Sequence, residues 1–124
     1  MSRRPDIQPN AGTMQADDRS ARIRALNDTL RQGFPSGEVV ATRGVAALPM
    51  VQQAALYLSI QAYDAFTEDN DPHGEHDFGA VNFDGELYLW KIDYYDNDLE
   101  FGSPDPSDPD VTRRVMTIMR ADEY

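Results

Sequence analysis

The spacing of apolar residues three or four positions apart predicts one helix, and a stretch rich in Ala, Gln and Leu predicts a second. The first begins at Asp17 or Asp18, because acids suit a first helical turn, and ends near Gly33, which suits a helix C-cap. The second follows Pro49 and covers residues 50–66, which are rich in Ala, Gln and Leu and predict a largely buried helix. The apolar face of the first helix contains Ile23, Leu26 and Leu30, and its polar side contains Arg19, Arg22, Arg24 and Arg31.

Strand patterns occupy the middle of the chain. Residues 38–42 contain two consecutive valines and predict a short strand. Residues 78–83 and 87–94 predict two further strands, joined by Asp84-Gly85, a dipeptide that accepts the positive φ angles of a type I′ hairpin turn. Apolar or aromatic side chains alternate onto both faces of the second hairpin strand, so we expect this strand to be central or covered on both faces.

The C-terminal part begins with an irregular segment, residues 102–109, whose three prolines exclude regular structure. Asp108 is placed to cap a third helix and Pro109 to open it, with an apolar face of Val111, Val115, Ile118 and Met119. The sequence therefore predicts a single α+β domain over residues 17–124, preceded by a disordered tail over residues 1–16. We expect a small antiparallel sheet of about three strands with a central hairpin, packed by three helices.

Composition narrows the class of protein. No apolar run approaches the ~20 residues of a membrane-spanning helix, and the 124 residues include no cysteine. We therefore expect a cytoplasmic protein without disulfides or thiolate metal sites.

Charge is spread very unevenly along the sequence. Residues 1–62 contain seven Arg and five acids, for +2, whereas residues 63–124 contain four bases and seventeen acids, for −13, which gives the net charge of −11. Between Asp64 and Asp110 there are fifteen acids and one base, Lys91. Such a field repels nucleic acids and anionic membranes and attracts basic protein surfaces or cations. We expect no direct binding to nucleic acid or membrane.

Both histidines and five acids fall within residues 67–79, the strongest candidate for chemistry. His73, His76 and Asp77 could bind a divalent metal ion as cofactor, or act as general acids and bases without a metal. A calcium loop fits poorly, because position 12 is Ala80 where a glutamate is needed. In the structural alternative, the Asp, Asn, Pro and Gly residues fold a tight turn and the histidines satisfy buried carbonyls.

A second group of carboxylates follows the central strand, and paired carboxylates can hold magnesium for phosphoryl transfer. The Glu-x-Lys spacing of restriction-type nuclease cores is missing, because Glu86 lies five residues before Lys91. As candidates for contact with a partner the sequence offers Asp69, Asp71, Glu75, Asp93, Asp96, Asp98, Glu100 and Asp105.

Several segments together carry a family resemblance: Thr42-Arg43-Gly44-Val45, residues 67–79, Trp90 through Asp96, residues 105–109 and Thr112-Arg113-Arg114-Val115. On these segments the stretch from Arg22 to Tyr124 resembles the bacterial family known as domain of unknown function 3768. The resemblance implies an alphaproteobacterial, often plasmid-borne setting. It implies no activity and no fold.

Three hypotheses about function follow. In the first, the chain is a non-enzymatic inhibitor or interaction protein of a mobile element, a counter-defence factor (anti-CRISPR or anti-restriction) that occupies a basic nucleic-acid-binding surface of a host protein. In the second, it is a metal-dependent hydrolase or nuclease that uses the histidines with Asp69, Asp71, Asp77 and Asp93. In the third, it is a structural subunit that hides its aromatic residues in a homodimer.

Overall fold

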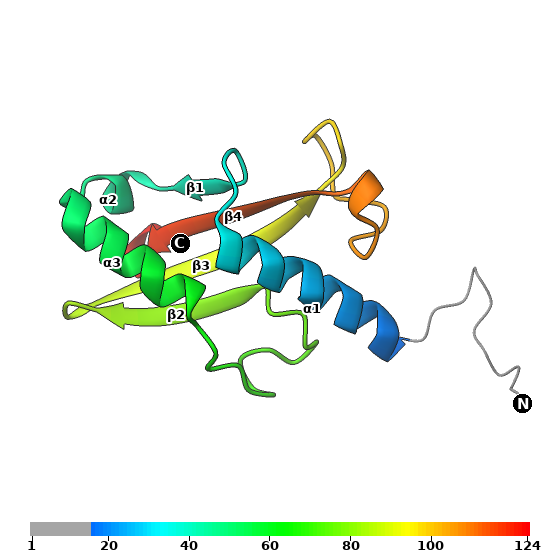
Figure 1. Cartoon of the computed structure of the whole chain (residues 1–124), viewed down its shortest axis with the longest axis horizontal. Helices are drawn as coiled ribbons and strands as arrows, with labels where there is room; N and C mark the ends of the chain where they lie inside the picture. The colour runs from blue at the N-terminus through cyan, green and yellow to red at the C-terminus, as the bar shows by residue number, and fades with distance from the viewer. Residues whose placement is uncertain (1–15) are drawn as a thin grey trace, which may run out of the picture.

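The computed structural model describes residues 16–124, which form an α+β fold with a four-stranded mixed sheet (Figure 1). The helices are α1 (Ala16–Gly33), α2 (Arg43–Ala46) and α3 (Met50–Gln61), and the strands are β1 (Val39–Ala41), β2 (Phe78–Phe83), β3 (Glu86–Tyr95) and β4 (Arg113–Arg120). Two single-turn 3₁₀ helices are η2 (Pro109–Val111) and η3 (Ala121–Glu123). The predicted α+β class is confirmed. The predicted tail lies outside the described residues, apart from Ala16, which begins α1.

The predicted hairpin and its tight turn are confirmed. Asp84 and Gly85 have φ angles of 54° and 82°, and the strand pairing closes at Phe83 opposite Glu86. The strand order is β1-β4-β3-β2, so β3 pairs with a neighbour on each side and is central, as expected. A single polar turn thus fixes the register of the two strands that carry most of the sheet's aromatic residues.

The predicted C-terminal helix is wrong, because residues 113–120 form strand β4. Pro109 opens only the 3₁₀ turn η2, where the Asp108 carboxylate caps the Asp110 amide at 2.9 Å. In β4 burial alternates through Arg114, Met116 and Ile118, which is the period of a strand. The spacing of the apolar residues fits both the helical and the strand period. The segment forms a strand because it pairs with β3 on one side and with β1 on the other. The β1–β4 pair is parallel, so the sheet is mixed rather than purely antiparallel.

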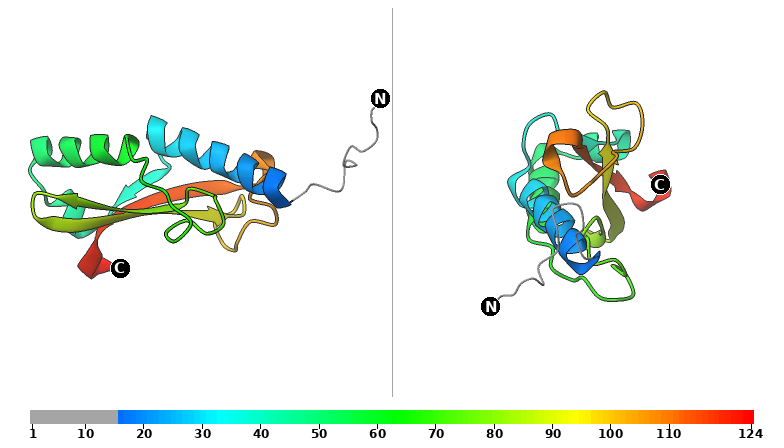
Figure 2. Two further views of the ribbon diagram at one scale, coloured as in Figure 1. Left: turned by 90° about the horizontal axis from the view of Figure 1, so that it is seen from below. Right: turned by 90° about the vertical axis from the view of Figure 1, so that its right-hand side faces the viewer.

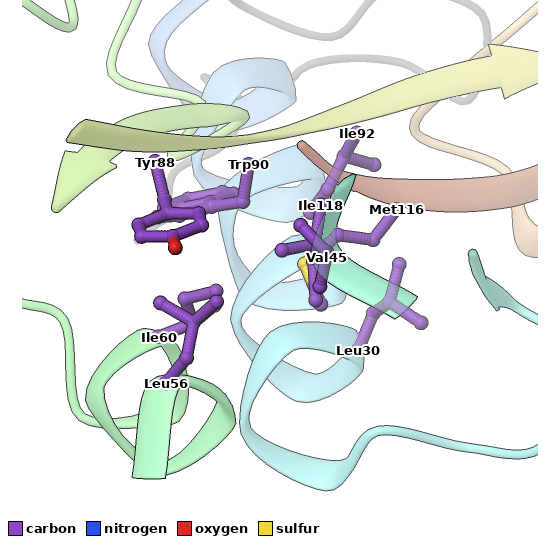
Figure 3. Packing of buried hydrophobic residues seen from close by; sticks show 9 residues of the cluster. All are labelled: Leu30, Val45, Leu56, Ile60, Tyr88, Trp90, Ile92, Met116 and Ile118. Carbon is purple, nitrogen blue, oxygen red and sulfur yellow. The ribbon is translucent and has the colours of Figure 1, made fainter. Parts of the chain in front are cut away.

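Helices α1 and α3 lie end to end, with their C-terminal ends adjacent, in one layer over one face of the sheet (Figure 2). The core between the two layers contains Leu30, Val45, Leu56, Ile60, Tyr88, Trp90, Ile92, Met116 and Ile118 (Figure 3). Trp90 is fully buried, and Gly79 on β2 leaves room for it, because a Cβ at that position would lie 2.4 Å from the indole Nε1.

Helix α3 is shorter and more exposed than predicted. It ends at Gln61 rather than near Phe66, and only Leu56 and Ile60 are buried along it. On the opposite face of the sheet the chain ends in η3, and Tyr124 packs near Phe78 with ring centroids 6.3 Å apart. No helix among residues 16–124 has the length and apolar character needed to cross a bilayer.

Candidate functional site

The histidine loop, defined as residues 67–77, connects α3 to β2 and is anchored along α1. Arg24 donates a hydrogen bond from Nη1 to the carbonyl of Gly74 at 2.8 Å. One turn further along α1, Asn27 donates from Nδ2 to the carbonyl of Glu75 at 3.0 Å. The loop is therefore tied through its main chain to two successive turns of one helix.

Asn27 is fully buried and is the centre of a polar network that joins α1, the loop and the sheet. Its Oδ1 accepts a hydrogen bond from Nε of Arg114 at 2.8 Å, and its Nδ2 also donates to the hydroxyl of Tyr94 at 2.8 Å. The Tyr94 hydroxyl in turn donates to Glu75 Oε1 at 2.8 Å. Burial raises the pKa of Tyr94 far above its ordinary value, so this hydroxyl stays a donor. Arg114 reaches onward to the carbonyl of Pro106.

His76 is stacked on one ring face and hydrogen-bonded through one ring nitrogen. Its Nδ1 donates to Asp28 Oδ1 at 2.8 Å, and its Nε2 lies 3.7 Å from Asp71 Oδ2. The ring stacks on Phe66 with centroids 3.7 Å apart and the planes 4° from parallel. Its main chain has a φ angle of 57°, and its amide donates to the Asp71 carboxylate at 3.2 Å.

Arg31 shares the Asp28 carboxylate with His76. The residue is only 2% exposed, donates from Nη1 to Asp28 Oδ1 at 2.9 Å, and holds its guanidinium over the rings of Phe66 and Trp90 at 5.3 and 5.4 Å. This corrects the expectation that Arg31 lies on the polar side of its helix. A shallow hollow of ≈ 380 Å³ opens beside this group, and a hollow of ≈ 410 Å³ between α1 and η2 contains no histidine.

Asp69, His73 and Asp77 make no side-chain hydrogen bond or ion pair with His76. His73 and Asp69 are exposed and make no side-chain hydrogen bond within residues 16–124. Asp77 is half-buried, and burial first, then the charge of Glu75, raises the pKa of its carboxyl above the ordinary value. Residues 16–124 contain no group of three or more His, Asp or Glu side chains placed to hold a metal ion.

The carboxylates near the end of β3 divide into engaged and free groups. Asp93 was expected after the central strand but lies within β3. Asp93 pairs with Lys91, whose pKa this hydrogen bond raises, and Asp96 accepts from the amide of Glu100 at 3.0 Å. Asp105 accepts hydrogen bonds from the hydroxyl and amide of Ser107, which lower its pKa. The side chains of Asp98, Glu100 and Asp110 make no hydrogen bond or ion pair with any other residue from 16 to 124.

The two acid-rich segments do not converge. The histidine loop lies beside the middle of α1, whereas the segment 96–110 lies at the end of the molecule where α1 begins (Figures 1 and 2). There Arg19 of α1 pairs with Asp105 at 3.2 Å, and Asn97 donates to the carbonyl of Asp110 at 3.0 Å. We call this region the acidic end; its carboxylates are Asp17, Asp18, Asp96, Asp98, Glu100, Asp105, Asp108 and Asp110.

Sequence reasoning missed the α1 and sheet residues of the network. Asn27 and Arg31 lie four and eight positions after Ile23, on the apolar face of α1, and this spacing was the available signal. Arg114 and Tyr94 sit opposite each other in the β3–β4 register. That pairing could not be anticipated while residues 113–120 were expected to be helical.

Comparisons with known proteins place the chain in a family. No curated protein and no solved structure matches it. The pattern of one family matches residues 41–123, which contain α2, α3, the histidine loop and strands β2 to β4, whereas the expected resemblance began at Arg22. Because this match covers more than half of the chain, the chain belongs to the family described as "Protein of unknown function (DUF3768)".

Proposed function

We propose that this chain is a non-enzymatic interaction protein whose acidic end occupies a basic, nucleic-acid-binding surface of another protein. The observation that carries the proposal is the set of exposed carboxylates at that end without an ion pair among the described residues: Asp98, Glu100 and Asp110. In the plasmid-borne setting that the family resemblance implies, such a protein acts as a counter-defence factor against a host enzyme.

The charge balance of the acidic end supports this reading. Its eight carboxylates face four guanidinium groups from the same part of the molecule, which leaves a local charge of about −4. The four bases are Arg19, Arg22, Arg113 and Arg114. Arg114 is buried and Arg19 is paired with Asp105. Arg22 and Arg113 are therefore the exposed bases of this end without an ion pair among the described residues. A DNA duplex presents about one charge per 1.7 Å, and an arginine-lined groove built for it attracts clustered carboxylates as well.

The contacts of His76 give its side chain a structural role. Nδ1 is hydrogen-bonded to Asp28 of α1 and Phe66 covers one ring face, so the side chain fixes the loop on α1. The Nε2 atom lies 3.7 Å from Asp71 and keeps its lone pair, so the proposal of a non-enzymatic protein rests on the acidic end and not on His76.

Capture from an alphaproteobacterial lysate on the immobilised full chain tests the proposal. We expect a nucleic-acid-binding protein to be recovered and to be released by added duplex DNA, because both ligands compete for one basic surface. Raising the salt concentration should weaken the complex, since charge dominates it.

Charge-matched variants locate the surface. The triple variant Asp98→Asn/Glu100→Gln/Asp110→Asn should lose capture at least about tenfold, roughly 1.4 kcal/mol. The control Asp64→Asn/Glu68→Gln/Asp84→Asn removes the same three charges from exposed positions elsewhere and should retain capture. Recovery of no nucleic-acid-binding protein, or equal losses in both triple variants, would falsify the proposal. His76→Ala should leave capture unchanged; its loss would point to the histidine loop instead.

A further inference from the structure

Helix α3 is apolar on two opposite faces, and only one of them is covered. Leu56 and Ile60 point into the core (Figure 3). At the helical period of 100° per residue, Val51 and Leu58 lie on the opposite side of the helix. Val51 is 82% exposed and Leu58 is 66% exposed. The outward stripe, defined as Val51, Ala54, Ala55, Leu58 and Ala62, follows the i, i+3, i+4, i+7 and i+11 spacing of a helix-packing face, with Ala62 at the C-cap just after Gln61.

This helix also carries no charge. Its twelve residues, MVQQAALYLSIQ, include no Asp, Glu, Lys or Arg, although 27% of the whole chain is charged. The basic partner proposed for the acidic end would find no carboxylate on the α3 surface. Two copies of a chain with net charge −11 repel each other wherever acid meets acid, and the α3 surface is one on which they can meet without doing so.

We infer that the outward stripe of α3 is a self-association surface, on which two copies of the chain pair α3 against α3 about a twofold axis. The axis passes near Ala54 and Ala55, the midpoint between Val51 and Leu58, so each Val51 lies near the other copy's Leu58. The two alanines let the helix backbones approach closely.

Electrostatics set the direction of the pair. In an antiparallel pair, the exposed Asp64, just beyond the end of α3, approaches the positive start of the other α3, which follows the exposed Arg43 of α2. A parallel pair would bring the Asp64 residues of the two copies close together, and their like charges would repel. The antiparallel pair also leaves both acidic ends free, because they lie at the far end of α1 from α3 (Figure 1).

The contact is small, so we expect a weak dimer. A helix of 12 residues is about 18 Å long, and α3 alone offers less than the roughly 800 Å² per partner of a standard interface. Sedimentation of the full chain between about 10 μM and 1 mM should show the mass rise from 13.9 kDa toward twice that value. Added salt should strengthen the dimer by screening the repulsion, whereas it weakens capture by the acidic end.

Matched substitutions test the surface itself. Leu58→Glu should abolish the concentration dependence, whereas Phe101→Glu, which adds the same charge at a residue 72% exposed elsewhere, should retain it. Val51→Lys should abolish it as well, although it lowers the net repulsion. A wild-type chain that stays monomeric at every concentration overturns the inference, and so does equal behaviour of Leu58→Glu and Phe101→Glu.

Cysteine trapping tests the direction, because the chain has no cysteine of its own. Ala54→Cys sits near the axis and should form a disulfide-linked dimer under oxidation, whereas Ala62→Cys lies away from the axis and should not. Cross-linking by both variants would indicate a parallel pair, and cross-linking by neither would overturn the pairing. These readouts use the purified chain alone, so their failure is distinct from failure of the capture experiment.

Discussion

Replacing Asn27 with alanine should destabilise the protein more than any other single polar truncation on α1. The side chain is fully buried and makes hydrogen bonds to the Glu75 carbonyl, the Tyr94 hydroxyl and Nε of Arg114. A neutral hydrogen bond contributes about 1 kcal/mol net, and one from a charged group about 1.5–3 kcal/mol. The Arg114 Nε would also be left buried without an acceptor. We therefore expect a loss of about 3–5 kcal/mol, a large share of the stability of an ordinary domain.

Urea unfolding followed by tryptophan fluorescence measures this loss. The chain has one tryptophan, Trp90, which is fully buried, so its emission reports directly on the core. The m-value should stay constant while the midpoint falls, because the same surface is exposed on unfolding. Gln32→Ala, at an exposed position of the same helix, serves as the control and should change stability by less than about 0.5 kcal/mol.

A double-mutant cycle of Asn27→Ala with Tyr94→Phe separates the energy of their hydrogen bond from the cost of the cavity that Asn27→Ala leaves. If the two side chains act through their 2.8 Å hydrogen bond, the double variant should lose less than the sum of the single losses by at least about 0.5 kcal/mol. Additive losses, or an Asn27→Ala cost similar to that of Gln32→Ala, would refute the view that this network clamps the histidine loop to the sheet.

Further predictions follow from packing and from titration. Gly79→Ala should cost at least about 1–3 kcal/mol, because its Cβ would meet the buried Trp90 at 2.4 Å, whereas Gly33→Ala, with nothing within 4 Å, should be neutral or stabilising. The raised pKa of Asp77 means that its carboxylate opposes folding at neutral pH and that stability returns as the pH falls through this pKa, so Asp77→Asn should raise the midpoint at pH 7. The lowered pKa of Asp105 has the opposite sign: its contribution is present above the ordinary carboxyl pKa and is lost as the pH falls below it, so Asp105→Asn should lower the midpoint at pH 7 but not in acid. NMR titration of the two carboxyls should place their midpoints on opposite sides of 3.8, and midpoints in the reverse order would contradict this account.

Local patterns sufficed where one interaction decides the structure. Asp84-Gly85 fixes the hairpin because few other residue pairs accept two consecutive positive φ angles. The first helix followed from its apolar spacing and its terminal signals, and α1 begins and ends within two residues of the expected positions. In both elements the deciding contacts lie within a few residues of each other along the chain.

The last element failed because its local signals are ambiguous. Asp108 and Pro109 do start a helical turn, but it closes after Val111. The residues beyond it satisfy either period, and β4 forms because the edges of β3 and β1 are available to it. Such long-range pairing is not encoded in any short window of the sequence.

The candidate site could be located in part for the same reason. The sequence singled out the loop that contains both histidines, but the contacts of this loop with α1 come from residues 48 to 50 positions away, such as Asp28 to His76 and Arg24 to Gly74. The sequence does not show these partners, because the hydrogen-bond partner of a polar residue on an apolar helix face is known only from the tertiary fold.

The network changes what the negative charge of the chain can do. Asp28, Asp71 and Glu75 are held by His76, Arg31 and Tyr94, so the carboxylates of the histidine loop serve mainly the fold. The free carboxylates concentrate at the acidic end, while the uncharged stripe of α3 lies at the other end of the helical layer. Salt therefore acts in opposite directions on the two proposed contacts, weakening the first and strengthening the second. A salt series that moved both contacts in the same direction would show that one of the two surfaces is assigned wrongly.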